Sequence, residues 1–300
     1  MPTSRRARIA RRSVAKTASG PEMTTAASRK RMDQLDRLPR PRKVDYVDTT
    51  VGGIPAIVAT PTAVEPVRHI LYIHGGAYVT GSPKSHIAMV ANLAKRASAT
   101  ATVIDYRLAP EHVHPAAIDD CVAAYRALVA DIDPALVTIA GDSAGGGAAL
   151  ATACALRDAG DPLPGALYLM SPWTDLTGSG ESVTTRQEFD PMLDGSRLVD
   201  AGLLYAGDTP LDDPGVSPLF ADLAGLPPML VQTGMDEILL SDSTRLADAA
   251  RDAGVDVTLD LADGMWHVYQ AFARFMPEAD DALIRAAVFI RGLTPALMVP

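Results

Sequence analysis

Short hydrophobic runs alternate with helical patterns along the chain after residue 41. Most of these runs are continuously apolar, which is typical of strands that are buried on both faces of a sheet. Because helical segments separate them, the pattern favours a mostly parallel, eight-stranded sheet with right-handed crossovers. The predicted strands are Val44–Asp48, Ile54–Thr60, His69–His74, Ala101–Asp105, Leu136–Gly141, Ala166–Met170, Met229–Gly234 and Val255–Leu261.

The helical segments between the strands have the periodicity of amphipathic helices. The clearest is Pro115–Ala130, and a second helix is predicted over Ala144–Leu156. Residues 174–216 interrupt the alternation with Gly, Asp and Pro, although Arg197–Tyr205 has a helical pattern. The order of elements therefore predicts an α/β fold over residues 44–300, with an insertion at about 174–216 above the sheet.

The composition is that of an ordinary globular domain. Of the 300 residues, 48% are hydrophobic and 21% are charged, which excludes wholesale disorder and collagen-like or coiled-coil character. Apolar runs stay well short of the roughly 18 residues that a membrane span needs, so no transmembrane segment is expected. The two cysteines, Cys121 and Cys154, are too few for a disulfide framework and lie in no metal-binding cluster. We therefore expect a cytoplasmic protein with no metal site.

Charge is distributed unevenly along the chain. Residues 1–43 contain 13 Lys and Arg against three acidic residues, whereas the net charge of the whole chain is −9. Residues 1–22 are predicted to form a solvated, partly disordered basic arm, with targeting or anion binding left open. A short helix is predicted from Ala27 to Leu38. The acidic remainder of the chain argues against a nucleic-acid partner.

The strongest chemical signal is the GxSxG sequence Gly141-Asp142-Ser143-Ala144-Gly145. It follows a predicted strand and opens a predicted helix, which is the context of a nucleophilic serine on a sharp turn. The glycines relieve crowding at such a turn, and the helix N-terminus directs N–H groups at an anion formed beside the serine. Ser143 is therefore the candidate nucleophile, the alternative being a glycine-rich loop that only turns the chain.

A second glycine-rich segment, His74-Gly75-Gly76-Ala77-Tyr78, closes an earlier predicted strand. A glycine pair after a central strand lets backbone N–H groups turn toward a neighbouring cavity. Gly75 and Gly76, together with the N–H of Ala144, are therefore predicted to form an oxyanion hole.

A nucleophilic serine needs a base that takes its proton and an acid that orients the base. Of the six histidines, only His267 lies downstream, in a glycine-led loop after the last predicted strand. The acid is expected between Ser143 and His267, at the carboxyl end of a strand. Asp236 and Glu237 both follow the strand Met229–Gly234, and the residues alone leave open which of the two points at the histidine.

Three motifs in sequence order resemble the bacterial hormone-sensitive-lipase family of esterases, and the resemblance spans about residues 44–292. The motifs are His74-Gly75-Gly76-Ala77 for the family's HGGG, Tyr106-Arg107-Leu108-Ala109-Pro110-Glu111-His112 for its YRLAPEH, and Gly141-Asp142-Ser143-Ala144-Gly145-Gly146 for its GDSAGG. The order of nucleophile, acid and base is also that of α/β hydrolases. The resemblance implies an α/β-hydrolase fold with a helical cap, formed by the later part of the basic arm and by the 174–216 insertion.

Two positions depart from the family's pattern. Ala77 replaces the third glycine of HGGG, which keeps a backbone N–H and adds a methyl group. The family's acid motif, usually D-P-L-x-D-E, reads here as Glu237-Ile238-Leu239-Leu240-Ser241-Asp242 when the preceding strand is matched without a gap. This register implies Glu237 as the acid, whereas a shift of one residue selects Asp236.

The resemblance implies a serine esterase that hydrolyses short- to medium-chain carboxylic esters through an acyl-enzyme, without a metal or organic cofactor. Ser143, Glu237 and His267 would form the triad, and Trp173 would either line the acyl pocket or pack the cap. The alternatives are an amidase, deacetylase or acyltransferase with the same triad, or a non-catalytic ligand-binding protein on the same fold. The expected partner is a small-molecule ester, and a homodimer is left open.

Overall fold

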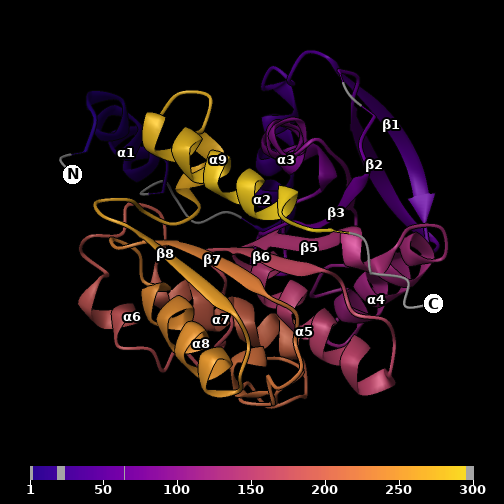
Figure 1. The fold of residues 1–300 in the computed structure, drawn as a ribbon. Coiled ribbons are helices and arrows are strands. Elements are labelled where there is room, and N and C mark those ends of the chain that lie inside the picture. The colour runs from indigo at the N-terminus through magenta and orange to yellow at the C-terminus, as the bar shows by residue number, and fades with distance from the viewer. Residues whose placement is uncertain (1–2, 19–23, 64, 295–300) are drawn as a thin grey trace.

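The computed structural model describes residues 3–18, 24–63 and 65–294. Its centre is an eight-stranded sheet in the order β1-β2-β4-β3-β5-β6-β7-β8 (Figure 1). The strands are β1 (Val44–Val51), β2 (Ile54–Pro61), β3 (Arg68–Ile73), β4 (Ala99–Ile104), β5 (Val137–Asp142), β6 (Ala166–Met170), β7 (Met229–Gly234) and β8 (Val257–Ala262). Each strand corresponds to one predicted strand, with ends that agree to within a few residues.

Strands β3 to β8 run parallel to one another. Strands β1 and β2 form an antiparallel hairpin, and β2 also pairs antiparallel with β4. Parallel neighbours need long connections, and helices supply most of them. The prediction of a mostly parallel sheet flanked by helices is confirmed.

Helices cover both faces of the sheet. Helices α3 and α9 lie on one face, and α4, α5 and α8 lie on the other (Figure 1). The helices are α1 (Arg5–Ala18), α2 (Thr25–Asp33), α3 (Pro83–Ala97), α4 (Ala116–Val129), α5 (Ala144–Ala159), α6 (Ser182–Thr185), α7 (Gly195–Ala206), α8 (Leu240–Asp252) and α9 (Pro277–Arg291). Within the described ranges, no helix is long and apolar enough to cross a membrane.

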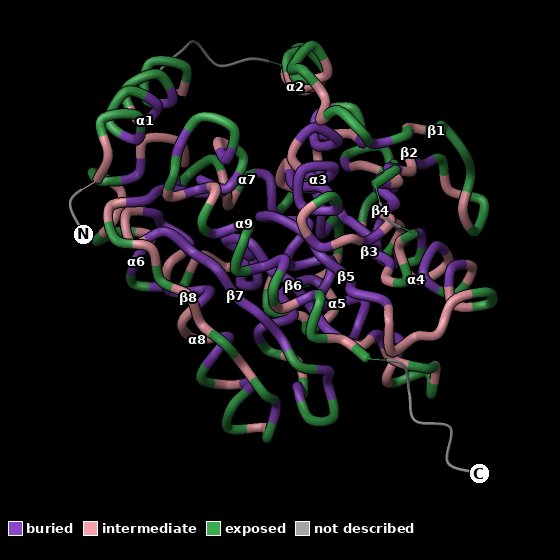
Figure 2. Tube along the Cα trace, turned by 45° about the horizontal axis from the view of Figure 1, so that its top comes forward, coloured by how far each residue is buried: buried purple, intermediate pink, exposed green. Residues whose placement is uncertain are grey.

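The continuous apolar runs of the central strands fill two separate cores. On β3, Ile70 and Tyr72 pack into the core under α3 and α9, while Leu71 and Ile73 pack into the core under α4 and α5. Successive side chains of a strand point to opposite faces, so a strand covered on both sides must be apolar at every position. The central strands are accordingly buried along their length (Figure 2).

The basic arm differs from the prediction. Residues 5–18, expected to be solvated and partly disordered, form helix α1, so the prediction is wrong for this stretch. Ala7, Ala10 and Val14 of α1 are buried in the same core as α9. These residues recur at helical spacing, but their small side chains give only a weak apolar signal among many arginines. Residues 1–2 and 19–23 of the arm lie outside the described residues.

The later part of the arm is helical, as predicted. Helix α2 is followed by the 3₁₀ turn η1 (Gln34–Arg37), which together match the predicted helix over Ala27–Leu38. Arg29 of α2 donates to the carboxylate of Glu111 and to the backbone carbonyl of Val79. This side chain therefore fastens α2 to the chain that follows β3 and β4.

The predicted insertion at 174–216 contains α6 and α7, and α7 covers the helical pattern that the sequence shows at Arg197–Tyr205. The tyrosine ring of Tyr205 stacks on Tyr78 with a centroid separation of 3.7 Å. Residue 64 and residues 295–300 of the predicted 44–300 domain lie outside the described residues. The division of the chain into arm, domain and insertion remains a prediction. The helices and strands alone do not show where one folding unit ends and the next begins.

Candidate active site

The register of the sheet brings the predicted site segments to one edge. Ile73, the last residue of β3, pairs with Gly141 near the end of β5, and Asp142 pairs with Met170 at the end of β6. The last residue of β7, Gly234, pairs with Ala262 at the end of β8. The loops that follow these parallel strands therefore leave from the same edge.

Ser143 occupies the turn between β5 and α5. Its backbone angles are φ 55° and ψ −124°, a conformation that costs a non-glycine residue on the order of 1–3 kcal/mol. The turn is tight, because a Cβ on Gly145 would lie 2.1 Å from the carbonyl oxygen of Ile73. The Ser143 N–H donates to the carbonyl of Met170 at 2.9 Å, which anchors the turn to β6. The serine thus lies at the N-terminus of α5, where an anion is favoured.

The glycine-rich segment after β3 has left-handed backbone conformations at three successive residues: Gly76 with φ 123°, Ala77 with φ 54° and Tyr78 with φ 61°. A side chain on Gly76 would place its Cβ 2.2 Å from the carbonyl oxygen of Thr80, so only glycine fits there. Over the described residues, the backbone N–H groups of Gly76 and Ala77 donate to no protein acceptor. They are available to a ligand.

Gly75 departs from the predicted oxyanion hole. Its backbone N–H donates to the Oδ1 atom of Asp142 at 3.1 Å, so it is engaged by a buried carboxylate. The approach is so close that a Cβ on Gly75 would lie 2.3 Å from the other carboxylate oxygen of Asp142. Glycine is therefore required at position 75 because Asp142 approaches it closely. The spacing of the motif does not indicate this contact.

His267 lies in the loop after β8. It is beside the loop after β7 that carries Asp236 and Glu237, which we call the acid loop. Its Nδ1 atom is 3.3 Å from the Oε1 atom of Glu237, and both side chains are buried. Burial alone would lower the pKa of His267, but the hydrogen bond and charge of Glu237 outweigh it, and the charges of Asp190 and Asp142 add to them. The net effect raises the pKa of His267. In the part of the chain that the structure describes, His267 alone among the histidines pairs with Asp236 or Glu237.

Two hydrogen-bond donors hold the second carboxylate oxygen of Glu237 in place. Oε2 accepts hydrogen bonds from the Ser171 hydroxyl at 2.8 Å and from the Gly234 N–H at 2.9 Å. The Ser171 hydroxyl oxygen in turn accepts from the N–H of Val268, next to His267. Ser171 therefore ties the acid loop to the histidine loop.

The neighbouring carboxylate points elsewhere. The Oδ2 atom of Asp236 accepts from the Nη1 atom of Arg11 at 2.8 Å, on the side of helix α1. Of the two candidates that the sequence left open, Glu237 is the one beside His267.

Comparison with known proteins identifies the family of this fold. The model of the α/β-hydrolase fold family matches residues 70–271. An acetyl-hydrolase of Streptomyces hygroscopicus is 42% identical over 246 residues, which cover 82% of each chain. An esterase of Acinetobacter venetianus is 40% identical over 284 residues, or 93% of this chain and 92% of its own length. The crystal structure of an esterase from the bacterial hormone-sensitive-lipase family superposes with a TM-score of 0.94 at 39% identity, covering 98% of this chain and 99% of that one.

The chain belongs to the bacterial hormone-sensitive-lipase family of α/β hydrolases. The resemblance inferred from the three motifs is confirmed, and so is the α/β-hydrolase fold.

A buried polar network underlies the glycine-rich loop of this family member. Asp142 accepts from the Tyr72 hydroxyl at 2.6 Å, and its Oδ2 atom lies 3.4 Å from Nε2 of His86. Burial opposes ionisation of Asp142, but the charge and hydrogen bond of His86, with the hydrogen bonds of Tyr72 and Gly75, lower its pKa to about 2. Burial lowers the pKa of His74, which is stacked between Tyr106 and His86, to about 3. The network thus combines one ionised carboxylate with a neutral His74.

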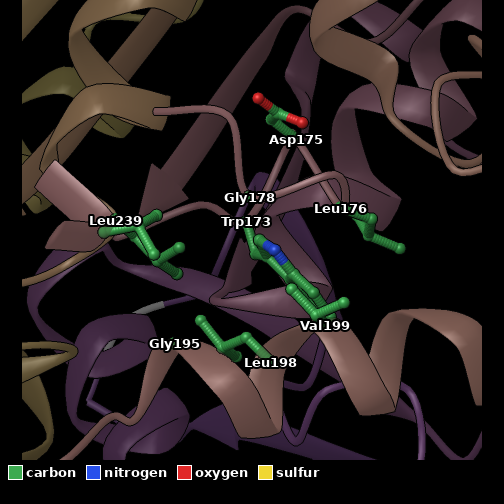
Figure 3. A pocket seen from close by; sticks show the side chains of 9 residues that line it. Trp173, Asp175, Leu176, Gly178, Gly195, Leu198, Val199 and Leu239 are labelled. Atoms are coloured by element: carbon green, nitrogen blue, oxygen red, sulfur yellow. The ribbon is translucent and has the colours of Figure 1, made fainter. Parts of the chain in front are cut away.

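A small apolar cavity lies where the insertion of this hydrolase meets the end of β6. Figure 3 shows the Trp173 ring among aliphatic side chains, with the Asp175 carboxylate pointing away from them. The N–H of Trp173 donates to the carbonyl of Ser143 at 2.9 Å, so this wall is attached to the candidate nucleophile. The other aliphatic lining residues are Leu176, Val183, Leu198, Val199 and Leu239.

Ser171 and Arg11 are contacts of the acid loop that the sequence analysis missed. Ser171 stands directly after β6 with φ 45°, and a polar residue at the carboxyl end of a parallel strand was the available signal. Arg11 gave no signal, because nothing in the arm indicated where α1 would pack. Within the described ranges, no cluster of three or more His, Cys, Asp or Glu side chains could hold a metal ion.

Proposed function

We propose that the protein is a serine esterase that hydrolyses carboxylic esters of short to medium acyl chain through Ser143, His267 and Glu237. The observation that carries the proposal is the buried pair of His267 and Glu237, 3.3 Å apart, at the sheet edge where Ser143 stands on its strained turn. A paired, oriented histidine and a serine on such a turn are the parts of an acyl-transfer site. Membership of a family whose relatives are named esterase and acetyl-hydrolase supports ester substrates.

In the proposed acylation step, the Ser143 oxygen attacks the ester carbonyl carbon while its proton passes to Nε2 of His267. Glu237 holds Nδ1 and stabilises the imidazolium that forms. The tetrahedral intermediate then collapses, its C–O bond to the alcohol breaks, and His267 returns the proton to the leaving alcohol. The serine remains as an acyl ester.

In the proposed deacylation step, water takes the place of the alcohol. His267 accepts a proton from the water as it attacks the acyl carbonyl, and then returns a proton to the Ser143 oxygen as the carboxylic acid leaves.

The oxyanion formed in each step needs preorganised donors. We assign this role to the backbone N–H groups of Gly76, Ala77 and Ala144. Gly76 and Ala144 were expected from the sequence, whereas Ala77 takes the place of Gly75, whose N–H is engaged by Asp142. The left-handed conformations of Gly76 and Ala77 support this assignment, since successive N–H groups in such a turn form an anion-binding concavity.

The cavity beside Trp173 has room for no more than about one water molecule, so the assignment of short acyl chains rests on the family resemblance and not on this cavity. Its lining is mostly aliphatic, and the N–H of Trp173 is bonded to the Ser143 carbonyl.

The test is a panel of p-nitrophenyl esters from acetyl to palmitoyl, with the matching anilides, on the wild type and on Ser143→Ala. We expect turnover of short-chain esters in the wild type, little turnover of anilides, and loss of turnover by a factor of about 10³ or more in Ser143→Ala. Anilide turnover that equals ester turnover would favour an amidase. A folded wild type that turns over neither substrate would favour a ligand-binding protein.

A homodimer and a cytoplasmic location stay predictions. The cytoplasmic location is supported by Cys121 and Cys154, which are both buried and unpaired.

A further inference from the structure

One arginine of the N-terminal arm is bonded to the glycine-rich segment 75–80 after β3, which we call the oxyanion loop. Arg29 of α2 donates from Nε to the carbonyl oxygen of Val79 at 2.8 Å and from Nη2 to the carbonyl oxygen of Ala109 at 2.8 Å. Its Nη1 and Nη2 atoms also donate to the two carboxylate oxygens of Glu111, at 2.9 Å and 2.7 Å. All three nitrogens of the guanidinium are therefore bonded to the loops that follow β3 and β4.

These bonds hold the oxyanion loop at two successive residues next to Ala77. The carbonyl of Tyr78 accepts from the N–H of Ala109 at 2.9 Å, and the carbonyl of Ala109 accepts in turn from Arg29. The carbonyl of Val79, one residue further along the loop, accepts from the same guanidinium. The arginine therefore fixes Val79 directly and Tyr78 through Ala109.

Both carbonyls depend on this one side chain. Over the ranges that the structure describes, no protein group other than Arg29 donates to the carbonyl of Val79 or of Ala109. Ala109 is only 1% exposed, and a buried carbonyl group without a partner is unfavourable. Loss of the guanidinium should therefore allow both loops to move toward other partners.

The backbone of the oxyanion loop requires contacts of this kind. Ala77 and Tyr78 are not glycines, yet they have left-handed conformations with φ 54° and 61°. Such conformations are unfavourable and persist where the surrounding structure imposes them. Asp142 holds the beginning of the loop at the N–H of Gly75, and Arg29 holds its end. The N–H groups that we assign to the oxyanion hole on this loop lie between these two fixed points.

We propose that Arg29 is a positioning residue for ester hydrolysis, which keeps the N–H groups of Gly76 and Ala77 directed at the oxyanion. This inference rests on the proposed function of the same site. The hydrogen bonds of Arg29 are to the two loops and not to Ser143 or His267, so it acts through the backbone of the oxyanion loop. The N-terminal arm thus contributes a residue that supports the reaction.

The experiment compares the wild type with Arg29→Met on a short-chain ester. Methionine keeps an unbranched side chain and removes every donor. Because the oxyanion forms only in the transition state, displaced donors should lower kcat by about 10- to 100-fold and change KM by less than about threefold. A folded Arg29→Met with the kcat of the wild type overturns the inference, and so does a variant in which only KM changes.

A short-chain trifluoromethyl ketone gives a second readout. The Ser143 oxygen adds to its carbonyl carbon while the serine proton passes to His267, and the ketone oxygen becomes an anion in the oxyanion hole. Its inhibition constant should rise in Arg29→Met by about the factor by which kcat/KM falls. A partly unfolded preparation loses turnover but keeps the inhibition constant of its folded fraction. An unchanged inhibition constant therefore overturns the inference.

Asp33→Ala is the matched control, because Asp33 fastens the same helix at another point. Its Oδ1 atom accepts from the hydroxyl of Ser82 at 2.6 Å, outside the oxyanion loop. The inference requires kcat and the inhibition constant of Asp33→Ala to stay within about threefold of the wild-type values. Equal losses in Asp33→Ala and Arg29→Met would assign the effect to the docking of α2 as a whole and overturn the role of Arg29.

Arg29→Lys covers the case in which Arg29→Met folds poorly. Lysine keeps the charge beside Glu111, but one ammonium group cannot reproduce the fork that reaches two carbonyls and a carboxylate. The inference requires a folded Arg29→Lys to lose kcat and inhibitor affinity together, by about three- to tenfold. Wild-type values of both overturn it.

The proposed function and this inference fail in different ways. If Ser143→Ala is inactive while the Arg29 variants behave as the wild type, this inference fails alone. If Ser143→Ala keeps its activity, the proposed function fails, and this inference fails with it.

Discussion

Arg11 donates to the carboxylate of Asp236 across 2.8 Å, and this ion pair engages the carboxylate that stands next to Glu237 in the sequence. The two acids follow the same strand and are chemically almost equivalent, yet they face different partners. Asp236 pairs with the N-terminal helix, while Glu237 reaches His267 in the buried interior. The N-terminal arm, whose sequence shows only that it is basic, therefore helps to determine which of the two acids faces His267.

The first prediction concerns these two acids. Glu237→Gln should lower kcat by about 10²- to 10⁴-fold, because the amide cannot stabilise the imidazolium and favours the wrong tautomer of His267. Asp236→Asn should change kcat by less than about tenfold, since it removes only a partly exposed ion pair. Steady-state kinetics on a short-chain ester measures both. A greater loss in Asp236→Asn than in Glu237→Gln would reverse the assignment.

The second prediction concerns Asp142, which lies under the glycine-rich loop after β3 that we propose as part of the oxyanion hole. Asp142→Asn should lower kcat by about 10- to 100-fold with little change in KM, because the loop that presents Gly76 and Ala77 loses the charge that orders it. Tyr72→Phe is the milder comparison, since it removes one hydrogen bond to Asp142 and keeps the charge. If Asp142→Asn raises KM and leaves kcat unchanged, the network supports binding rather than the transition state.

The third prediction concerns the docking of helix α1. Ala10→Asp places a carboxylate against the core and should lower both the thermal unfolding temperature and the ester turnover, because an unpaired buried charge is unfavourable. Ser13→Asp adds the same charge on the exposed face of α1 and should leave both unchanged. Differential scanning calorimetry and an activity assay distinguish the two variants. Equal behaviour would show that α1 contributes nothing to the folded state.

The fourth prediction concerns Asp242 at the start of α8. Burial raises its pKa to about 7, against the hydrogen bonds from the N–H groups of Asp175 and Thr174. Folded Asp242 therefore keeps its proton up to about pH 7, whereas the unfolded chain releases it near about pH 4. Its contribution to the free energy of unfolding is full below about pH 4, falls as the pH rises to about 7, and is level above that.

Urea unfolding of the wild type and of Asp242→Asn at several pH values between 4 and about 7 measures this contribution. The stability of the wild type relative to the variant should decline as the pH rises through this interval. Asp248→Asn, on the exposed face of the same helix, should show no such trend. A pH-independent difference between the wild type and Asp242→Asn would mean that the buried carboxyl is ionised throughout.

The sequence by itself determined the parts of the molecule that depend on local order. Continuous apolar runs separated by amphipathic helices specify a parallel sheet, because a strand covered on both faces must be apolar at every residue. Ser143 and Gly76 could be named for the same reason, since a strand, a tight turn and a helix follow one another directly in the chain. The small residues around Ser143 indicate that the turn is crowded, and this inference requires no knowledge of tertiary contacts.

The tertiary structure alone decided which groups face one another across the sheet edge. Glu237 lies beside His267 and Asp236 beside Arg11, which are 30 and 225 positions away from them in the sequence. The N–H of Gly75 is occupied by Asp142, from a strand 67 positions further on, which no local pattern records. Hydrogen bonds and charge pairs act over a few ångströms in space whatever their separation along the chain, so the assignment of polar partners required the folded arrangement.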